Sequence, residues 1–445
     1  MLRTWWWPVF VFLYPLLAAP WSTSSAAPFQ AHAYPTLLFL AGGVILELKA
    51  RGWPSFAELG TAFLRVRRHP VVILALLFGV WVVVAALFSP SPALALTGSL
   101  VYGSDGALWE LALVAVFVLV YLETLRVPAM GRRIAIAAVA AGLVLTVLAL
   151  LEVVLHHALI VNVPESALPI VTFPQKGHLA GMLALAGGVA MGLWPNVLVA
   201  GIAFGIGLTL NRSAGLALLA AALVPLLRGR KGLRGAAVIA VLAVAGLVAG
   251  GVFVKGISTP HKQVASVGSL DSRLYHYRAA LNGIAARPVF GWGGGNFDLV
   301  WPNYLSRANL ARFARAEWGY PKLIDVHAGG YGLPVLYVQD AQGKKVMAQD
   351  VAFKAHDEPL DAALMWGVVG AVLYLLLLLL GLRGLRRGDA LAWGLATYYV
   401  FLLLWFVIPE TQGLLWAMLG AAAAGEHGAW SVDRLRPRAE RSTEA

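Results

Sequence analysis

Cysteine is absent from this sequence, which excludes disulfides and thiolate metal sites. Charge is scarce as well: 13% of the 445 residues are charged, whereas a soluble domain has about 25%. The sequence is dominated by apolar residues, since 60% are hydrophobic and the mean hydropathy is +0.75. Soluble domains are only about 45–50% apolar, so we predict an all-α, polytopic membrane protein.

Long apolar runs recur along the chain, and each can cross a hydrocarbon core of about 30 Å as a helix. They predict about twelve transmembrane helices, at residues 4–20, 33–48, 70–88, 107–125, 133–155, 178–194, 196–210, 213–227, 235–254, 361–380, 389–408 and 412–425. The first run follows Arg3 and is followed by small residues before Trp21, a pattern that also fits a cleaved signal peptide. We favour an uncleaved span, because the run is long and rich in Trp and the next span follows closely.

Most lysines and arginines lie in short loops between these runs, near residues 49–68, 126–133, 228–234 and 383–387, and in the C-terminal tail. Loops of this kind stay in the cytoplasm, which explains the net charge of +12 better than nucleic-acid binding does. The N-terminus is therefore predicted inside and the polar segment outside. The predicted division is transmembrane helices 1–9 at 1–254, a large extracytoplasmic loop at 255–360, helices 10–12 at 361–425 and a cytoplasmic tail at 426–445.

Residues 196–227 form one apolar run of 32 residues, interrupted only by Asn211, Arg212 and Ser213. A single helix of this length would measure about 48 Å, and three basic loops would move outside. The sequence therefore predicts two short spans that meet at Arg212. An arginine there can snorkel to the outer interface, or it can bind an anionic group, because guanidinium forms bidentate hydrogen bonds with phosphate.

The polar segment has predicted elements of its own. Residues 271–286 fit an amphipathic helix capped by Asp271 or Ser272, with Arg273 and Tyr277 on one face. A second helix is predicted from about Pro302, and residues 335–338 and 345–347 form a predicted β-hairpin.

His356 lies beside Asp357 and Glu358 at the start of the next membrane helix. It can be a capping or interfacial residue, or an imidazole that takes a proton from a hydroxyl group. A neighbouring carboxylate would orient the ring or raise its pKa. Asp357, Glu358 and Asp361 are reserve candidates for the base.

Two further groups of residues give weaker indications of a functional site. Residues 291–295, rich in glycine, do not link a strand to a helix, so they predict a tight loop that lets backbone approach another element, rather than a nucleotide site. His156 and His157 follow Glu152 but lack further ligands at a metal spacing, so we interpret them as structural.

Several basic residues on the outer side remain open to two interpretations. Arg273 and Arg278 on the amphipathic helix can simply be solvated or touch lipid head groups. Lys176 and His178, at the outer start of the sixth span, can line a cavity.

Taken together, four motifs resemble the O-antigen ligase and polymerase-like membrane glycosyltransferases. They are Leu208 to Leu216 around Arg212; Ser272-Arg273 with Tyr277; Pro288 to Phe297 in the form P-x-x-G-x-G-x-x-x-F; and Ala355-His356-Asp357 with Leu360, Trp366-Gly367 and Gly370. The family usually has Ser, Trp and Asn where this sequence has Asn211, Tyr277 and Asp357. The last difference puts a carboxylate where the family has an amide beside the histidine.

The resemblance implies a GT-C-like enzyme in the bacterial inner membrane, with its active site on the periplasmic face. It implies transfer of a glycan from undecaprenyl or another polyprenyl diphosphate to a hydroxyl group, with inversion and without a metal or cofactor. The implied catalytic residues are His356 as base and Arg212 and Arg273 as ligands of the diphosphate. Weaker candidates for contacts with the diphosphate or glycan are Arg278, Tyr277, Asp357, Glu358, Lys176 and His178.

The sequence leaves alternatives open. The acceptor can be lipid A-core, which makes the enzyme a ligase, or a growing polymer, which makes it a polymerase, or a protein. Outside this class the chain can be a transporter of lipid-linked glycans, although transporters usually show paired repeats and helices broken at matching positions. The chain can also be a structural scaffold or a receptor. The sugar, its chain length and the oligomeric state are not readable from the sequence.

Overall fold

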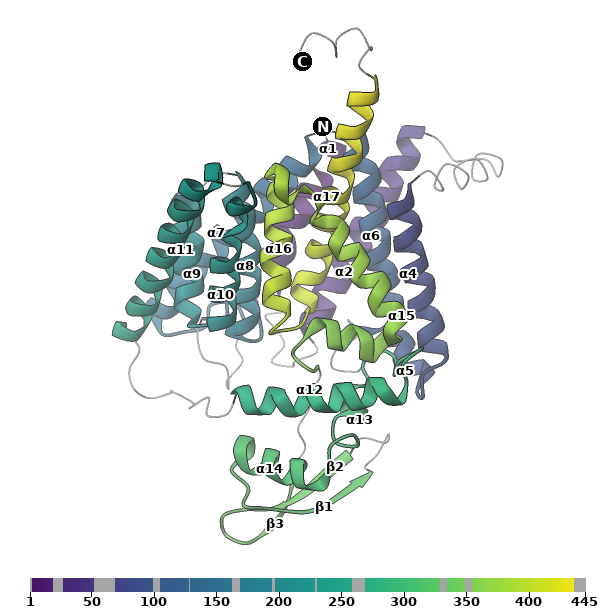
Figure 1. The fold of residues 1–445 in the computed structure, drawn as a ribbon, viewed down its shortest axis with the longest axis vertical. Helices are drawn as coiled ribbons and strands as arrows, with labels where there is room; N and C mark the ends of the chain where they lie inside the picture. The colour runs from purple at the N-terminus through teal and green to yellow at the C-terminus, as the bar shows by residue number, and fades with distance from the viewer. Residues whose placement is uncertain are drawn as a thin grey trace.

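The computed structural model describes residues 2–18, 27–51, 69–98, 105–127, 129–161, 169–193, 197–228, 230–257, 269–328, 334–348 and 354–435. The described chain is mainly helical, with a bundle of apolar helices and a polar layer across one end of it (Figure 1). The basic residues predicted to mark the cytoplasmic side at 52–68, and those of the tail at 436–445, lie outside the described residues.

A helix occupies each of the twelve ranges predicted to span a membrane. These helices are α1 (Leu2–Leu13), α2 (Ala27–Arg51), α4 (Pro70–Leu87), α6 (Ala107–Arg126), α7 (Met130–Leu155), α8 (Lys176–Leu193), α9 (Val197–Thr209), α10 (Arg212–Ala221), α11 (Arg230–Ile257), α15 (Glu358–Gly381), α16 (Ala390–Leu402) and α17 (Pro409–Leu435). Short helices connect some of them: η1 (Tyr14–Leu16), α5 (Pro92–Thr97), η3 (Val224–Arg228) and η6 (Arg383–Arg387).

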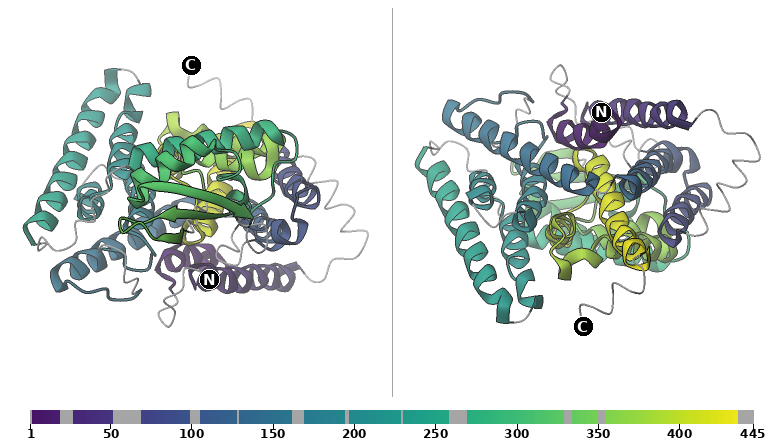
Figure 2. Two further views of the ribbon diagram at one scale, coloured as in Figure 1. Left: turned by 90° about the horizontal axis from the view of Figure 1, so that it is seen from below. Right: turned by 90° about the horizontal axis from the view of Figure 1, so that it is seen from above.

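Six of the described helices are long and apolar enough to cross a membrane, and α9, α10 and α16 are shorter apolar helices. The chain is therefore a helical polytopic membrane protein, as its composition predicts, while the count of twelve spans stays a prediction. Both termini lie at one end of the bundle and the polar layer at the other (Figure 1). Seen along the bundle from the polar side, α12 (Ser269–Ala286) and the sheet lie across the end of the helices (Figure 2).

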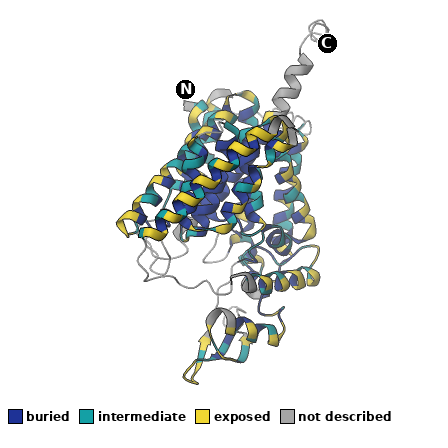
Figure 3. Ribbon diagram, turned by 60° about the vertical axis from the view of Figure 1, so that its left-hand side comes forward, coloured by how far each residue is buried: buried dark blue, intermediate teal, exposed yellow. Residues whose placement is uncertain are grey.

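Burial separates the central helices from the outer ones (Figure 3). α8 is buried from Gly177 to Met191, because its small residues let neighbouring helices approach closely. By contrast, Val241 and Val252 on α11 are each 66% exposed, and Leu38 on α2 is 70% exposed. Large apolar side chains on the outside of an apolar bundle are expected where it faces lipid.

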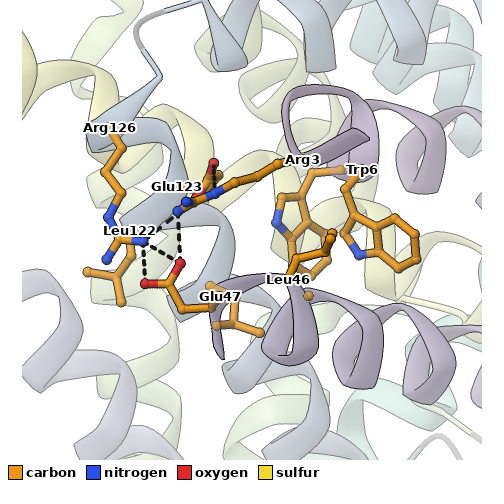
Figure 4. A pocket seen from close by; sticks show the side chains of 10 residues that line it. Arg3, Trp6, Leu46, Glu47, Leu122, Glu123 and Arg126 are labelled. Carbon is orange, nitrogen blue, oxygen red and sulfur yellow. Dashed lines mark hydrogen bonds and ion pairs between the residues drawn. The ribbon is translucent and has the colours of Figure 1, made fainter. Parts of the chain in front are cut away.

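α1 is joined to α2 and α6 by ion pairs at the end of the bundle that holds the termini (Figure 4). The guanidinium of Arg3 lies 2.8 Å from a carboxylate oxygen of Glu47 and 2.8 Å from one of Glu123. Arg126 adds a bond of 2.7 Å to Glu47. Further along the chain, Tyr14 is fully buried. α1 is therefore packed as a helix of the bundle, while its retention as an uncleaved span stays a prediction.

The predicted interruption of the apolar run at Arg212 is confirmed. α9 ends at Thr209, and Leu210 has a left-handed φ of 54°. Asn211 then caps α10, since its side chain accepts a hydrogen bond of 2.9 Å from the amide of Ala214.

The predicted helix at 389–408 is shorter than expected. α16 ends at Leu402, and the residues up to Ile408 leave the helix before α17 starts at Pro409. The carboxylate of Glu358 accepts a hydrogen bond of 2.9 Å from the amide of Val407 and so pairs one backbone group of this non-helical stretch. We call residues 403–408 the α16–α17 turn.

The polar layer contains α12, α13 (Phe297–Val300), α14 (Arg307–Trp318) and a three-stranded antiparallel sheet, in the order β1 (Lys322–Ala328), β2 (Pro334–Gln339) and β3 (Lys345–Ala348). The predicted β2–β3 hairpin is confirmed, with Tyr337 opposite Met347. β1 was not predicted, because its sequence mixes charged and apolar residues. The layer has its own core, in which Trp301 and Phe313 contact each other at 5.1 Å between ring centres.

Two predicted helix starts in this layer are wrong. α12 begins at Ser269, so Asp271 and Ser272 lie in its first turn and are not its cap. α14 begins at Arg307 rather than near Pro302, because Ser306 provides the cap: its hydroxyl accepts a hydrogen bond of 3.3 Å from the amide of Asn309.

The glycine-rich loop at 291–295 docks on a break in α15, which confirms its predicted role in close backbone approach. At Gly367 the backbone of α15 leaves the helix, with φ 68° and ψ 176°. The amides of Trp292 and Gly293 donate to the carbonyls of Leu364 and Met365, each at 2.8 Å. A Cβ atom on Gly367 would lie 1.9 Å from the carbonyl oxygen of Val289, so only glycine fits.

Candidate functional site

The predicted site residues converge where three parts of the chain meet at the boundary between the polar layer and the bundle. These parts are α12, the segment 354–357 that leads into α15, and the α16–α17 turn. The start of α8 reaches the same place. Five rings from these elements contact one another, and we call them the ring cluster: His178, His276, His356, Trp405 and Phe406.

His356 lies at the centre of the ring cluster. Its ring meets Trp405 and Phe406 edge-on, at 5.5 and 5.0 Å between ring centres. Its Nδ1 lies 3.2 Å from the carbonyl oxygen of Lys354. A carbonyl can only accept, so this hydrogen bond requires the proton on Nδ1 and leaves the lone pair on Nε2.

Burial lowers the pKa of His356 to about 4, and the positive charge of Arg273 acts in the same direction. The imidazole is therefore neutral near neutral pH. The prediction that a neighbouring carboxylate raises this pKa is wrong. The carboxylate of Asp357 instead caps α15 by accepting a hydrogen bond of 3.0 Å from the amide of Leu360.

His276 was missed in the sequence, although it lies between Arg273 and Tyr277 on α12. Its ring is nearly parallel to that of His356, with an interplanar angle of 10° and 5.9 Å between centres. The residue is only 6% exposed, and neither ring nitrogen has a hydrogen-bond partner among the described residues. Burial lowers the pKa of His276 to about 3, so it too is neutral.

Arg273 and Tyr277 share one face of α12, as predicted, and both reach the ring cluster. The guanidinium carbon of Arg273 lies 5.1 Å from the centre of the Trp405 ring, within range of a cation–π interaction. The Tyr277 hydroxyl donates a hydrogen bond of 3.2 Å to the carbonyl of His356. Burial raises the pKa of Tyr277, and the charge of Asp357 adds to this, so the phenol keeps its proton.

The start of α8 brings His178 to Trp405 as well. The two rings meet edge-on with centres 6.0 Å apart, and His178 is 2% exposed with both ring nitrogens unpartnered among the described residues. Lys176 is two residues earlier, at the first position of α8. A Cβ on the intervening Gly177 would lie 2.7 Å from the Trp405 ring and 3.3 Å from the Asn211 side chain.

Arg212 is therefore next to a residue that borders the ring cluster, at the first position of α10. Its own side chain is exposed and makes no hydrogen bond or ion pair with a described residue. Arg278 is likewise exposed on α12. The structure thus brings Arg273, Tyr277, His178 and His356 together, and leaves the other two arginines at the surface.

Glu358 and Asp361 face the interior and not the ring cluster. Glu358 is 3% exposed and accepts the hydrogen bond from Val407. Asp361 is 1% exposed and accepts one of 2.7 Å from the amide of Ala355. Each carboxylate is buried and accepts a hydrogen bond from a backbone amide, so His356, in the ring cluster itself, is the better placed member of this segment to accept a proton from an incoming group.

The other predicted polar groups have structural contacts. Glu152 is fully buried and accepts hydrogen bonds from the amides of Leu159, Ile170 and Val171 at 2.8–2.9 Å. Among the described residues, no group of three or more His, Asp or Glu side chains is arranged to hold a metal ion.

Residues 197–375 match the family model described as O-antigen ligase, which confirms the resemblance over that segment. No curated protein matches the chain. The matched residues run from the start of α9 into α15, and include Arg212, Arg273, Tyr277 and His356. Trp405 and Phe406 lie beyond them.

Proposed function

We propose, from the match of residues 197–375 to the O-antigen ligase family model, that this chain is a membrane glycosyltransferase with a polyprenyl-diphosphate-linked glycan as donor. The acceptor is a hydroxyl group, in the first instance on lipid A-core. The site acts on the periplasmic face of the bacterial inner membrane. The transporter and scaffold readings do not account for a neutral, oriented histidine beside a half-buried arginine.

The observation that carries this proposal is the state of His356. Its Nδ1 proton is bound to the Lys354 carbonyl at 3.2 Å, so Nε2 is free to accept a proton. The low pKa of this ring keeps it neutral in the absence of donor. The negative diphosphate would offset the effect of Arg273 and raise the pKa of His356, so the base becomes stronger when the donor is bound.

The reaction then proceeds by direct displacement. The acceptor O–H gives its proton to Nε2 of His356 as its oxygen forms a bond with the anomeric carbon of the sugar. The bond from that carbon to the diphosphate oxygen breaks, and the electron pair leaves with the diphosphate. The configuration at the anomeric carbon is inverted.

Arg273 neutralises the charge that develops on the diphosphate. Its guanidinium is half-buried against Trp405, where an electrostatic interaction is stronger than in water. We assign Arg212 a supporting role on the diphosphate, from its place beside Asn211 at the border of the ring cluster. Tyr277, Lys176 and His178 line the same region, and Arg278 is the most peripheral candidate.

Purified protein in liposomes, given a polyprenyl-diphosphate oligosaccharide and lipid A-core, tests the proposal. We expect His356→Gln to reduce transfer by about 10²–10⁴-fold, the usual contribution of a general base. His327→Gln is the matched control, because His327 is an exposed histidine on β1 that pairs with Asp325. Full activity of correctly inserted His356→Gln protein would overturn the assignment of the base.

The same assay distinguishes a ligase from a polymerase. A second lipid-linked unit is offered in place of lipid A-core. Product on lipid A-core identifies a ligase, whereas a ladder of longer lipid-linked chains identifies a polymerase.

A further inference from the structure

An ion pair is buried directly behind the segment that carries His356. The ammonium of Lys354 lies 3.1 Å from a carboxylate oxygen of Asp105, and the two side chains are 6% and 5% exposed. Burial alone would lower the pKa of Lys354, but the carboxylates of Asp105, Glu358 and Asp361 outweigh it and raise this pKa. The lysine therefore stays charged, and it connects the beginning of α6 to the entry of α15.

The carboxylates around Lys354 also bind the backbone on either side of the ring cluster. Asp361 accepts from the amide of Ala355 at 2.7 Å, one residue before His356. Glu358 accepts from the amide of Val407 at 2.9 Å, next to Phe406. The buried charges thus fix two short non-helical segments that carry the rings of the site.

His356 needs such support because its backbone is in an unfavourable conformation. Its φ of 65° lies in the left-handed region, which costs a residue with a side chain about 1–2 kcal/mol. Conformations of this kind persist only where the surrounding contacts determine them. Lys354 provides two of these contacts: its ammonium is held by Asp105, and its carbonyl accepts the Nδ1 proton of His356.

A purely stabilising role does not account for this arrangement. Each buried charge loses its hydration at a cost of several kcal/mol, and apolar residues of similar size often stabilise a protein as well or better. Two further oxygens nearby, Oδ2 of Asp361 and Oε2 of Glu110, are buried without a hydrogen-bond partner among the described residues. The lysine held by this ion pair is also the residue whose carbonyl oxygen lies 3.2 Å from Nδ1 of His356.

We propose that Lys354 and Asp105 are positioning residues for glycosyl transfer: their ion pair holds the Lys354 carbonyl where it fixes His356 as the Nδ1–H tautomer, with Nε2 facing the acceptor hydroxyl. This inference rests on the proposed function, in which His356 is the base. Asp105 lies outside the residues that match the family model, so the match itself does not point to it.

The direct test is the tautomer of His356, observed by nitrogen NMR on histidine-labelled protein in liposomes and assigned by difference from His356→Gln. We expect the wild-type ring to be wholly the Nδ1–H form. In Asp105→Asn the lysine loses its partner, and we expect a substantial fraction of the Nε2–H form. An unchanged tautomer in this variant would overturn the proposal.

Kinetics provide the second readout. We expect Asp105→Asn to lower kcat by about 10–100-fold while KM for the donor changes less than about twofold, because the diphosphate contacts are untouched. Asp105→Glu keeps the charge and displaces it by one methylene, so it tests the proposal if Asp105→Asn does not fold. Asp105→Glu should lower kcat less than Asp105→Asn and retain the Nδ1–H form, and unchanged kcat in both variants would contradict the proposal.

Asp389→Asn is the matched control. Asp389 is a partly buried aspartate that caps α16 at the other end of the bundle, through bonds to the amides of Leu391 and Ala392. This variant should lose thermal stability without changing the tautomer of His356. The tautomer measurement needs no substrate, so a failure of the proposed function, seen as full activity in His356→Gln, is distinguishable from a failure of this inference.

Discussion

The indole ring of Trp405 contacts three side chains of the proposed active site. Arg273 covers its face at 5.1 Å, and His356 and His178 meet it edge-on at 5.5 and 6.0 Å. An aromatic face holds a guanidinium in place without competing for its N–H donors, which remain available to an anion. In the proposed reaction, Trp405 therefore orients Arg273 for the diphosphate.

Replacing this indole should weaken donor binding. The Trp405→Ala change removes a cation–π interaction of about 0.5–2 kcal/mol, which corresponds to a rise in KM for the donor of roughly 2- to 30-fold. Steady-state kinetics against the lipid-linked donor measures this. Trp405→Phe keeps an aromatic face and should recover most of the affinity; equal KM values for Trp405→Ala and wild-type protein would refute the role.

The pH dependence of transfer should follow His356. Its pKa is lowered to about 4 by burial and by Arg273, and only the neutral ring is a base. We therefore expect kcat/KM to rise with pH through about 4 and to be level between about pH 6 and pH 8. Arg273→Gln removes a positive charge that lowers this pKa, so its acid limb should move to higher pH.

Arg312→Gln is the control for that profile, because Arg312 is an exposed arginine on α14. Its acid limb should coincide with that of the wild-type protein. If the acid limb of the pH profile does not move in Arg273→Gln, the group whose titration produces that limb is not His356.

Among the elements, α15 depends most on a partner from elsewhere in the chain. It is broken at Gly367, and the loop before Asn296 supplies the amides that pair the carbonyls of Leu364 and Met365. In return, the amide of Val368 donates to the carbonyl of Pro288 at 2.8 Å. The break joins the bundle to the polar layer by backbone hydrogen bonds.

Gly367→Ala should disrupt this junction. The new Cβ would lie 1.9 Å from the carbonyl oxygen of Val289, at a φ that disfavours any side chain. We expect a loss of several kcal/mol of stability, seen as a lower midpoint of thermal unfolding in detergent. Gly235→Ala on α11 is the matched control, since its Cβ would have no neighbour within 4 Å, and it should be neutral or slightly stabilising.

The elements that the sequence predicted well are those with a local signal. The apolar runs located every bundle helix, although some ends differ from the prediction by six to ten residues, and the turn residues 340–343 between two short strands located the β2–β3 hairpin. The α16–α17 turn was missed because Trp405 and Phe406 are apolar and looked like the end of a span. In the non-helical stretch that contains them, the amide of Val407 is paired by Glu358, about fifty residues earlier in the chain.

The residues of the site were also predicted only where the sequence carries a local signal. Arg273, Tyr277 and His356 were predicted together because each lies in a short motif. Asp105 and Lys354 carry no local pattern, and they meet only because α6 and α15 are brought together by the fold. Arg212 was expected in the site, and the structure puts its neighbour Asn211, rather than its own side chain, at the border of the ring cluster.

At the level of the whole molecule, the fold separates two ends. The polar layer and the ring cluster occupy one, and the termini and the Arg3 ion pairs occupy the other (Figure 1). The basic residues of η6 lie on the connection between α15 and α16, at the end remote from the polar layer. Positive charge on that side predicts that it faces the cytoplasm.

The absence of cysteine makes this orientation directly measurable. Lys345→Cys introduces a thiol at an exposed position of β3, and Arg387→Cys one at an exposed position of η6. A membrane-impermeant maleimide applied to intact spheroplasts should label the first and reach the second only after permeabilisation. The reverse pattern would place the ring cluster on the cytoplasmic side and contradict the proposed site of transfer.

The break in α15 also bears on how the chain enters the membrane during synthesis. Without a hydrogen-bond donor for the carbonyls of Leu364 and Met365, α15 would be costly in free energy to release into lipid. Lipid contains no water that could donate these hydrogen bonds instead. The loop that pairs them is about seventy residues earlier in the chain, so it has left the ribosome before α15 does. We therefore expect exit of α15 from the translocon to be coupled to docking of that loop.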